Sequence, residues 1–241
     1  VDHLSSLVLL MIRGEAHADI SPWLCGALLM ALPKKDGSFR PIAVGDTFRR
    51  LAAKVLCAAY QEQARRYLWP LQIGVAQPLG TEVGLQVARQ WCHRHRSSPN
   101  MVFLKLDFSN AFNTIDRTFI LKEVRNRMPG LAAWVDFCYA RPSKLLFGSH
   151  VLPSERGVQQ GDPLGPLLFS LALQPILQEL AQSRVLVDSS WSTPTWTTFA
   201  WLGMQVLFCL HCRPCSPAAP RSALLSVLGW SPILGEVLSK D

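Results

Sequence analysis

The feature that most constrains the fold is an apolar, strand-like run that ends in a single acidic residue. Residues 102–106 read Val-Phe-Leu-Lys-Leu, and Asp107 follows them directly. An ionised carboxylate at the end of a buried strand is costly unless it faces water, pairs with a cation or binds a metal. Asp107 therefore marks either a metal site at a strand tip or an ordinary turn or helix-capping aspartate.

A second segment, residues 156–166, has the composition of a loop whose backbone can approach a ligand. It contains Gly157, Gly161 and Gly165 as well as two prolines, and the apolar, helix-like run 167–173 follows at once. Taken alone, the same glycines and prolines also fit a plain loop before a helix. Taken together with the strand that ends at Asp107, the two segments point to one shared site.

Three ordered motifs resemble the fingers and palm of a reverse transcriptase, and are most similar to those of non-LTR retrotransposons and related group II intron proteins. The motifs are Leu-Pro-Lys-Lys-Asp-Gly-Ser-Phe-Arg-Pro-Ile at 32–42, Phe-x-x-x-Asp-Phe-Ser-Asn-Ala-Phe-Asn at 103–113 and Arg-Gly-Val-Gln-Gln-Gly-Asp-Pro-Leu at 156–164. The likeness spans roughly residues 20–185. It implies RNA-directed DNA polymerisation, a phosphoryl transfer that depends on two magnesium ions held by carboxylates.

The resemblance also implies roles for particular residues. Asp107 would be the catalytic, metal-bridging carboxylate, and the carbonyl oxygen of Phe108 would be a further Mg²⁺ ligand. One aspartate cannot hold two ions, so two more carboxylates are expected on a neighbouring palm hairpin. The residues expected to contact the incoming deoxynucleoside triphosphate are Lys34, Lys35, Arg40, Phe112, Gln160 and Gly161.

Four basic residues, Arg49, Arg50, Lys54 and Arg156, are expected to contact phosphates of the RNA template and the DNA primer. Each assignment has a structural alternative. The fingertip cations could form only a solvated turn, the aromatic ring at 112 could be a core residue, and the Gln-Gly pair at 160–161 could serve only to form a turn.

The third catalytic motif of the family, an aromatic residue followed by any residue and two aspartates, is missing. It should lie a little over thirty residues after Gln160. The sole acidic residue in 183–199 is Asp188, so this stretch contains no Asp-Asp pair. Residues 189–241 hold five charged residues in 53, against 36 in the preceding 188, so the composition changes here too. Read from the third base of the Pro194 codon, the next codons permit Tyr-Leu-Asp-Asp. We therefore hypothesise a change of reading frame, or an unspliced junction, between about residues 183 and 194.

The predicted fold class is α+β, with right-hand polymerase fingers, a partial palm made of an antiparallel sheet with packed helices, and no thumb. Residues 1–100 would form N-terminal helices and fingers, residues 101–188 the partial palm, and residues 189–241 an atypical, frame-shifted and poorly ordered tail. We expect the palm sheet to lack its central hairpin. Periodicity and turn residues predict helices over 47–68, 80–95, 117–127 and 131–139, and hairpins over 25–44 and 143–153. Asp116 is expected to cap the start of the helix over 117–127.

The net charge and the distribution of apolar residues limit the classes of partner but do not identify one. A formal charge of +7 suits a phosphate-backbone partner, although a mildly basic domain is common. The chain shows no signal pattern and no apolar run of membrane length, so we expect an intracellular protein of the cytoplasm or nucleus without a membrane partner. The oligomeric state stays open.

By ancestry the chain is thus an RNA-directed DNA polymerase, expected to be inactive as written and to bind Mg²⁺ weakly or not at all. The alternative is a non-catalytic RNA-binding remnant or a pseudogene product of a retrotransposon. A third reading, a metal-binding protein, rests on the Cys-x-x-Cys-x-x-Cys spacing of Cys209, Cys212 and Cys215.

Overall fold

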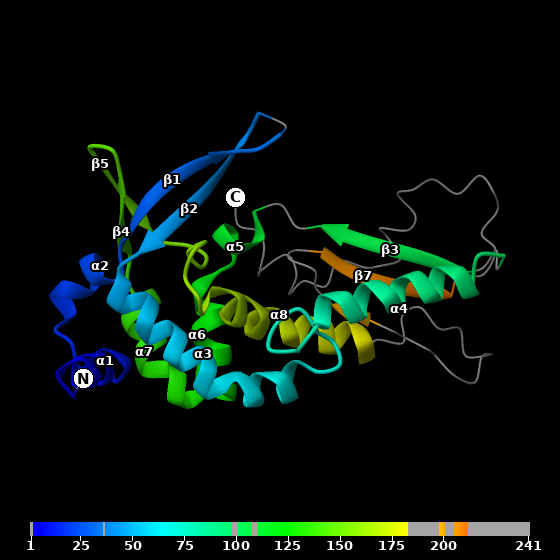
Figure 1. Ribbon diagram of the computed structural model, residues 1–241, viewed down its shortest axis with the longest axis horizontal. Coiled ribbons are helices and arrows are strands. Elements are labelled where there is room, and N and C mark those ends of the chain that lie inside the picture. The colour runs from blue at the N-terminus through cyan, green and yellow to red at the C-terminus, as the bar shows by residue number, and fades with distance from the viewer. Residues whose placement is uncertain are drawn as a thin grey trace. The chain divides into compact units, whose positions relative to one another are not determined.

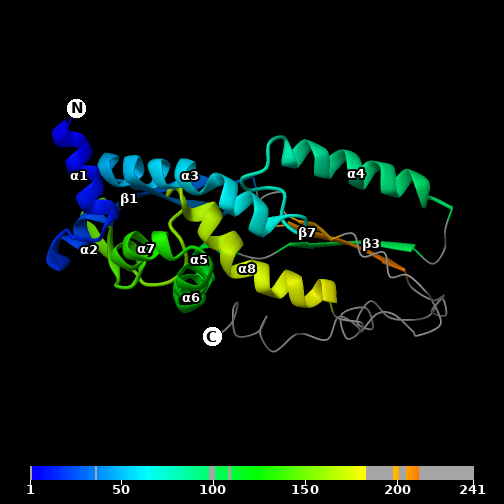
Figure 2. The same ribbon diagram turned by 90° about the horizontal axis from the view of Figure 1, so that it is seen from below.

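The structure is a computed structural model that describes residues 2–35, 37–97, 101–107, 110–182, 198–200 and 205–211. The chain folds into two compact units, drawn in Figures 1 and 2. The first unit comprises residues 1–62 and 110–172, and the second comprises residues 63–109 and 173–241. Within the described residues, no helix has the length and apolarity needed to cross a membrane.

The first unit is built on a four-stranded mixed sheet with the order β2-β1-β4-β5. Strands β1 (Ala27–Pro33) and β2 (Phe39–Gly45) form one antiparallel hairpin, and β4 (Ser143–Phe147) and β5 (His150–Ser154) form another. Both hairpins were predicted. In Figure 1 the β1–β2 hairpin extends well beyond β4 and β5. The two hairpins join through β1 and β4, which run parallel, and no pattern in the sequence indicated this pairing.

Helices cover the base of this sheet. They are α1 (Asp2–Ile12), α2 (Ser21–Leu24), the first part of α3 (Thr47–Leu68), α5 (Ala111–Thr114), α6 (Arg117–Arg127), α7 (Ala132–Tyr139) and the start of α8 (Gly165–Gln182), with the short 3-10 turns Ala18–Ile20 and Pro129–Leu131.

Local signals explain where α6 begins and ends. The carboxylate of Asp116 accepts a hydrogen bond from the backbone N–H of Thr118, as the predicted N-cap requires, and Pro129 begins the turn that follows the helix. Figure 2 shows α6 and α7 side by side, consistent with their packing against each other. The core between the helices is apolar and fully buried, and it includes Ile120, Val124, Leu131, Trp134, Leu168 and Phe169.

The second unit has a three-stranded antiparallel sheet in the order β3-β7-β6. It contains β3 (Met101–Asp107), β7 (Gln205–His211) and β6 (Thr198–Ala200), together with α4 (Gly80–Arg94) and the later parts of α3 and α8. Asp107 ends β3, as predicted. The expectation that this sheet lacks a hairpin is wrong for the backbone, because β6 and β7 pair with each other and β7 pairs along the whole of β3. Strand-forming residues in 198–211 can pair whether or not they carry catalytic side chains.

Candidate nucleotide-binding site

The loop of residues 156–164 is attached at its start to the segment that carries Phe112. Gly157 has φ +67° and donates its N–H to the carbonyl oxygen of Ile115 at 2.9 Å. The N–H of Val158 donates to the carbonyl oxygen of Phe112 at 2.7 Å. A Cβ atom on Gly157 would lie 2.3 Å from that same Phe112 oxygen, so only glycine allows this approach.

The other end of the loop lies against strand β2. The N–H of Ala43 donates to the carbonyl oxygen of Gln160 at 2.8 Å, which extends the pairing of β2 by one hydrogen bond. Gly161 has φ +131°, and a Cβ there would lie 2.3 Å from the Ala43 carbonyl oxygen. The Gln160–Gly161 pair therefore lies beside the strand that carries Arg40. Gly161 is exposed and Gln160 is half-buried, so both can be reached by a ligand.

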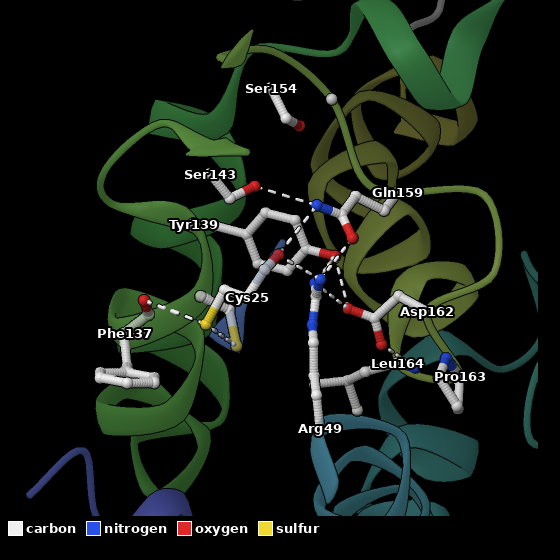
Figure 3. Close-up of polar contacts among 12 residues, drawn as sticks. Cys25, Arg49, Phe137, Tyr139, Ser143, Ser154, Gln159, Asp162, Pro163 and Leu164 are labelled. Carbon is white, nitrogen blue, oxygen red and sulfur yellow. Dashed lines mark hydrogen bonds and ion pairs between the residues drawn. The ribbon is translucent and has the colours of Figure 1, made fainter. Parts of the chain in front are cut away.

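A buried ion pair holds the middle of the loop. Arg49 on α3 has a side chain only 2% exposed, and its NH2 atom lies 3.0 Å from Oδ2 of Asp162, whose side chain is equally buried. The NH1 atom of Arg49 donates to the carbonyl oxygen of Cys25 at 2.6 Å and also to Oε1 of Gln159. Figure 3 shows the guanidinium group pointing between Gln159 and Asp162. One arginine thus contacts both residues that flank the Gln160–Gly161 pair.

Tyr139 and the backbone complete the coordination of Asp162. The Tyr139 hydroxyl donates to Oδ2 at 2.5 Å, and the N–H of Leu164 donates to Oδ1 at 2.9 Å. Burial raises the pKa of Tyr139 well above its usual value, and the neighbouring carboxylate raises it further, so the hydroxyl stays protonated. Burial alone would lower the pKa of Arg49, but the Asp162 carboxylate raises it, so the guanidinium group stays charged.

A second arginine holds the start of the loop. Arg117, the first residue of α6, donates from Nε to the carbonyl oxygen of Gly157 at 2.9 Å. Its NH1 and NH2 atoms donate to the backbone and side-chain oxygens of Ser154, at 2.7 and 2.8 Å. The guanidinium groups of Arg117 and Arg49 lie 5.2 and 5.6 Å from the centre of the Tyr139 ring, which links the two anchors by cation–π contacts.

Sequence reasoning did not single out Asp162, Tyr139 or Arg117 as site residues. One local signal was available for the arginine. A cation at the first position of a helix is opposed by the helix dipole, so Arg117 needed a compensating partner elsewhere in the fold. Nothing local indicated the tyrosine, which reads as an ordinary helix-end aromatic.

The predicted fingertip cations lie on or next to the β1–β2 hairpin. Lys34 and Lys35 are exposed at the end of the β1–β2 hairpin, where Gly37 adopts φ +82°, and Arg40 is exposed on β2. None of the three forms an ion pair with another described residue.

Phe112 is half-buried, and its ring stacks on that of Phe169 with the centroids 4.8 Å apart. The structure thus gives this residue a packing role next to the loop. Arg50, Lys54 and Arg156 are exposed. Arg49 differs from them, because its guanidinium group is buried and engaged by protein oxygens. A side chain so placed cannot reach a nucleic-acid phosphate, and the predicted phosphate contact at Arg49 is replaced by a structural role.

The predicted metal site falls mostly on the second unit, where the donor set is poor. Phe108 lies outside the described residues. Asp107 is paired in register with Gln205, and residues 198–200 and 205–211 contain no Asp or Glu. Among the residues whose side chains the structure describes, no three His, Cys, Asp or Glu groups gather in a way that could hold a metal ion. Two of the three cysteines of the Cys-x-x-Cys-x-x-Cys motif, Cys212 and Cys215, lie outside the described residues. Within residues 101–107, 198–200 and 205–211, Asp107 is the sole carboxylate, and one carboxylate is too few for a site that holds two magnesium ions.

Comparison with known families accounts for the three sequence motifs. Residues 32–193 match the profile of the family described as reverse transcriptase (RNA-dependent DNA polymerase). The chain belongs to the reverse transcriptase family. This match includes all three motifs and every predicted nucleotide-contacting residue of this reverse transcriptase domain.

Several retrotransposon proteins are similar in sequence to this reverse transcriptase domain. The retrotransposable element SLACS 132 kDa protein of Trypanosoma brucei gambiense is 26% identical over 193 residues, covering 75% of this chain and 15% of that protein. The retrovirus-related Pol polyprotein from type-1 retrotransposable element R2 of Popillia japonica is 28% identical over 186 residues, covering 70% of this chain and 25% of the relative. The transposon TX1 uncharacterized 149 kDa protein of Xenopus laevis is 25% identical over 163 residues. The chain spans between 12% and 25% of the length of these relatives.

Solved telomerase structures share the fold of the reverse transcriptase domain. Apo telomerase from Candida tropicalis, truncated from its C-terminal domain, superposes with a TM-score of 0.58 at 11% identity, covering 91% of this chain and 49% of that one. Telomerase from Candida albicans, in complex with a TWJ fragment of telomeric RNA, gives a TM-score of 0.57 at 12% identity, covering 89% of this chain and 40% of that one. At such low identity these structures bear on the fold alone.

Proposed function

We propose that this domain keeps the nucleotide- and nucleic-acid-contacting surfaces of a non-LTR-type reverse transcriptase but does not synthesise DNA. Membership of the reverse transcriptase family supports the polymerase ancestry. The observation that carries the loss of activity is the composition of the β6–β7 hairpin, which lies beside Asp107 and offers no second carboxylate. In this proposal the hairpin keeps its backbone pairing with β3 and has lost the carboxylates that would bind metal ions.

Magnesium supplies reverse transcriptases with activation of the attacking oxygen and neutralisation of the leaving pyrophosphate. Mg²⁺ prefers carboxylate and water oxygens in a near-octahedral arrangement. In this chain the partner of Asp107 on β7 is the neutral amide Gln205. We therefore infer weak or absent Mg²⁺ binding.

Nucleotide binding depends on different residues and survives this loss in our proposal. The exposed cations Lys34, Lys35 and Arg40 would contact the triphosphate, the lysines as point charges and the arginine with its planar fork. Gln160 and Gly161 would contact the nucleotide through amide and backbone groups. Their attachment to β2 through Ala43 supports this assignment, because a backbone hydrogen bond then joins the loop to the strand that carries Arg40.

Phosphates of an RNA template and a DNA primer would be contacted by Arg50, Lys54 and Arg156. All three are exposed, and the chain carries a formal charge of +7. Such contacts are independent of sequence and weaken as salt displaces the protein from the phosphate backbone. We assign the β1–β2 hairpin to the fingers and the β3-β7-β6 sheet to the palm, an assignment supported by the likeness to telomerase. We expect this domain to act inside the cell, in the cytoplasm or nucleus.

Primer extension on an RNA template, with Mg²⁺ and deoxynucleotides, tests the proposed inactivity. We expect extension no greater than that of the Asp107→Ala variant measured at the same protein concentration. Extension clearly above that variant would refute the proposal, since it would require a functioning metal site built from residues other than those identified.

Binding of a fluorescent RNA–DNA primer duplex tests the retained surface. We expect affinity to fall between 50 and 200 mM salt by about tenfold or more, as several phosphate contacts require. The double variant Arg50→Gln and Lys54→Gln should weaken binding and flatten this salt dependence. A folded protein without measurable duplex binding would favour a pseudogene product that has no nucleic-acid function.

A further inference from the structure

One face of the four-stranded sheet is apolar across all four strands and is exposed on β1, β4 and β5, whereas Val44 on β2 is half-buried. The strand register places Val44, Leu28, Leu146 and Val151 in a single row that crosses all four strands on the same side. Four strands spaced by about 4.8 Å make this row roughly 14 Å wide. The row forms the base of an apolar surface.

The same face continues along β1 and past the end of β4. Met30 and Leu32 follow Leu28 at two-residue intervals and therefore point to the same side. At the other end, Nζ of Lys144 lies 3.5 Å from the centre of the Trp23 ring, and Lys144 shares its side of β4 with Leu146. We call this surface the outer face. Its large apolar side chains are between 40% and 57% exposed, and they are Trp23, Leu28, Met30, Leu32, Leu146 and Val151.

The candidate nucleotide site shares Arg40 with the outer face but none of its six large apolar residues. Ala27 and Ala43 point to the opposite side of the sheet, where both are buried, and the Gln160–Gly161 pair contacts the sheet at Ala43. Monomeric proteins rarely leave an apolar surface of this extent facing water unless something binds to it. The outer face therefore needs an explanation separate from the proposed function.

The charged residues of the sheet indicate the charge that a partner of the outer face would carry. The four strands contain no Asp or Glu, whereas Arg40 and Lys144 both fall on the outer face by the register and by strand alternation. A partner with carboxylates beside an apolar surface would meet both cations and cover the apolar residues between them.

Two other occupants fit less well. A second copy of the chain, face to face, would bring two sets of the same cations together, at a cost in repulsion. Single-stranded nucleic acid would need aromatic stacking surfaces, but the outer face is aliphatic apart from Trp23. An α-helix about 10 Å across fits a surface about 14 Å wide, and Leu28 to Leu32 spans about 13 Å along β1.

We propose that the outer face is a docking surface for an amphipathic helix of a partner protein, one with an apolar stripe flanked by acidic residues. The apolar stripe lies over the Leu28 row, and its flanking carboxylates lie near Arg40 and Lys144. This proposal shares Arg40 with the proposed nucleotide site and is otherwise independent of the polymerase ancestry and of the loss of activity.

Two synthetic helical peptides of about 18 residues, or five turns, serve as the probes. Both carry the same leucine stripe, one with glutamates beside it and the other with lysines in the same positions. Fluorescence anisotropy with the complete chain gives their affinities. We expect the acidic peptide to bind about tenfold or more tightly than the basic one, an advantage that falls with salt.

Substitutions on the surface separate this proposal from misfolding. Leu28→Gln should weaken binding of the acidic peptide about fivefold or more, whereas Leu9→Gln, a similarly exposed leucine on α1, should leave it unchanged. Lys144→Glu should reduce the preference for the acidic peptide, and circular dichroism should show that all three variants keep the parent fold.

Four outcomes would overturn the proposal. They are equal binding of the two peptides, binding of neither, self-association of the chain that Leu28→Gln abolishes, and loss of RNA binding in Leu28→Gln. The third outcome would assign the outer face to a second copy of the chain, and the fourth to nucleic acid.

Discussion

Replacing Asp162 by Asn is the sharpest test of how the loop is held. The change keeps the size of the side chain and an oxygen that can accept from Leu164, but it removes the charge that compensates Arg49. Breaking a buried ion pair by removing one partner costs about 3–5 kcal/mol, because the remaining charge is left in a poorly solvated place. The short hydrogen bond from the Tyr139 hydroxyl also loses its ionised acceptor, which places the expected loss towards the upper end of that range.

Scanning calorimetry and urea unfolding provide the measurement. For a chain of 150–250 residues, each kcal/mol shifts Tm by about 2–4 °C, so Asp162→Asn should lower the Tm by roughly 6–20 °C. The matched control is Asp136→Asn. Asp136 pairs with Arg125 at 2.7 Å, but the two side chains are 36% and 55% exposed, so this change should cost less than about 1 kcal/mol.

Hydrogen exchange adds a local readout of the same perturbation. The Ala43 N–H donates to the Gln160 carbonyl oxygen, so loosening of the loop should speed exchange at Ala43. An Asp162→Asn protein within about 1 kcal/mol of the parent, or no less stable than Asp136→Asn, would refute the argument that the buried pair anchors the loop.

Three further changes test individual contacts. Tyr139→Phe should cost about 1–3 kcal/mol in urea unfolding, because Asp162 loses a buried donor, and no loss would show that water replaces it. Gly157→Ala should cost about 2 kcal/mol or more, since φ is +67° and the new Cβ would meet the Phe112 carbonyl oxygen at 2.3 Å, and an unchanged Tm would contradict that geometry. Burial raises the pKa of the Cys57 thiol to about 11, so iodoacetamide should alkylate Cys57 more slowly than the exposed Cys92 at pH 9. Equal alkylation rates would contradict this shift. The contribution of Cys57 to the free energy of unfolding should be complete below pH 9 and lost as pH rises through about 11, because the thiol of the unfolded chain releases its proton at lower pH than the thiol of the folded chain.

The sequence was a good guide wherever structure is set by neighbours along the chain. The periodicity of residues 47–68 and the Asp116 cap predicted α3 and α6 with their observed limits. Turn residues predicted both hairpins of the first unit, and the abrupt charge after an apolar run predicted that β3 ends at Asp107. These features follow from backbone preferences and capping, which act over a few residues.

The sequence was a poor guide to contacts between distant segments. Arg49 lies on a helix rich in basic residues and looked like its neighbour Arg50, yet one is buried in an ion pair and the other faces solvent. The pairing of β7 with both β3 and β6 was also missed, because the change in composition after residue 188 hid the ability of the backbone to form a hairpin there.

By itself, therefore, the sequence determined the family, the order of the local elements and the absence of an Asp-Asp pair after residue 188. Only the tertiary structure decided which charges are structural. The loop of residues 156–164 is held by Arg49, Asp162, Tyr139 and Arg117, which come together from four separate segments. The physical reason is that a buried charge is tolerable only where the fold supplies its partner, and that partner lies more than a hundred residues away along the chain for Arg49.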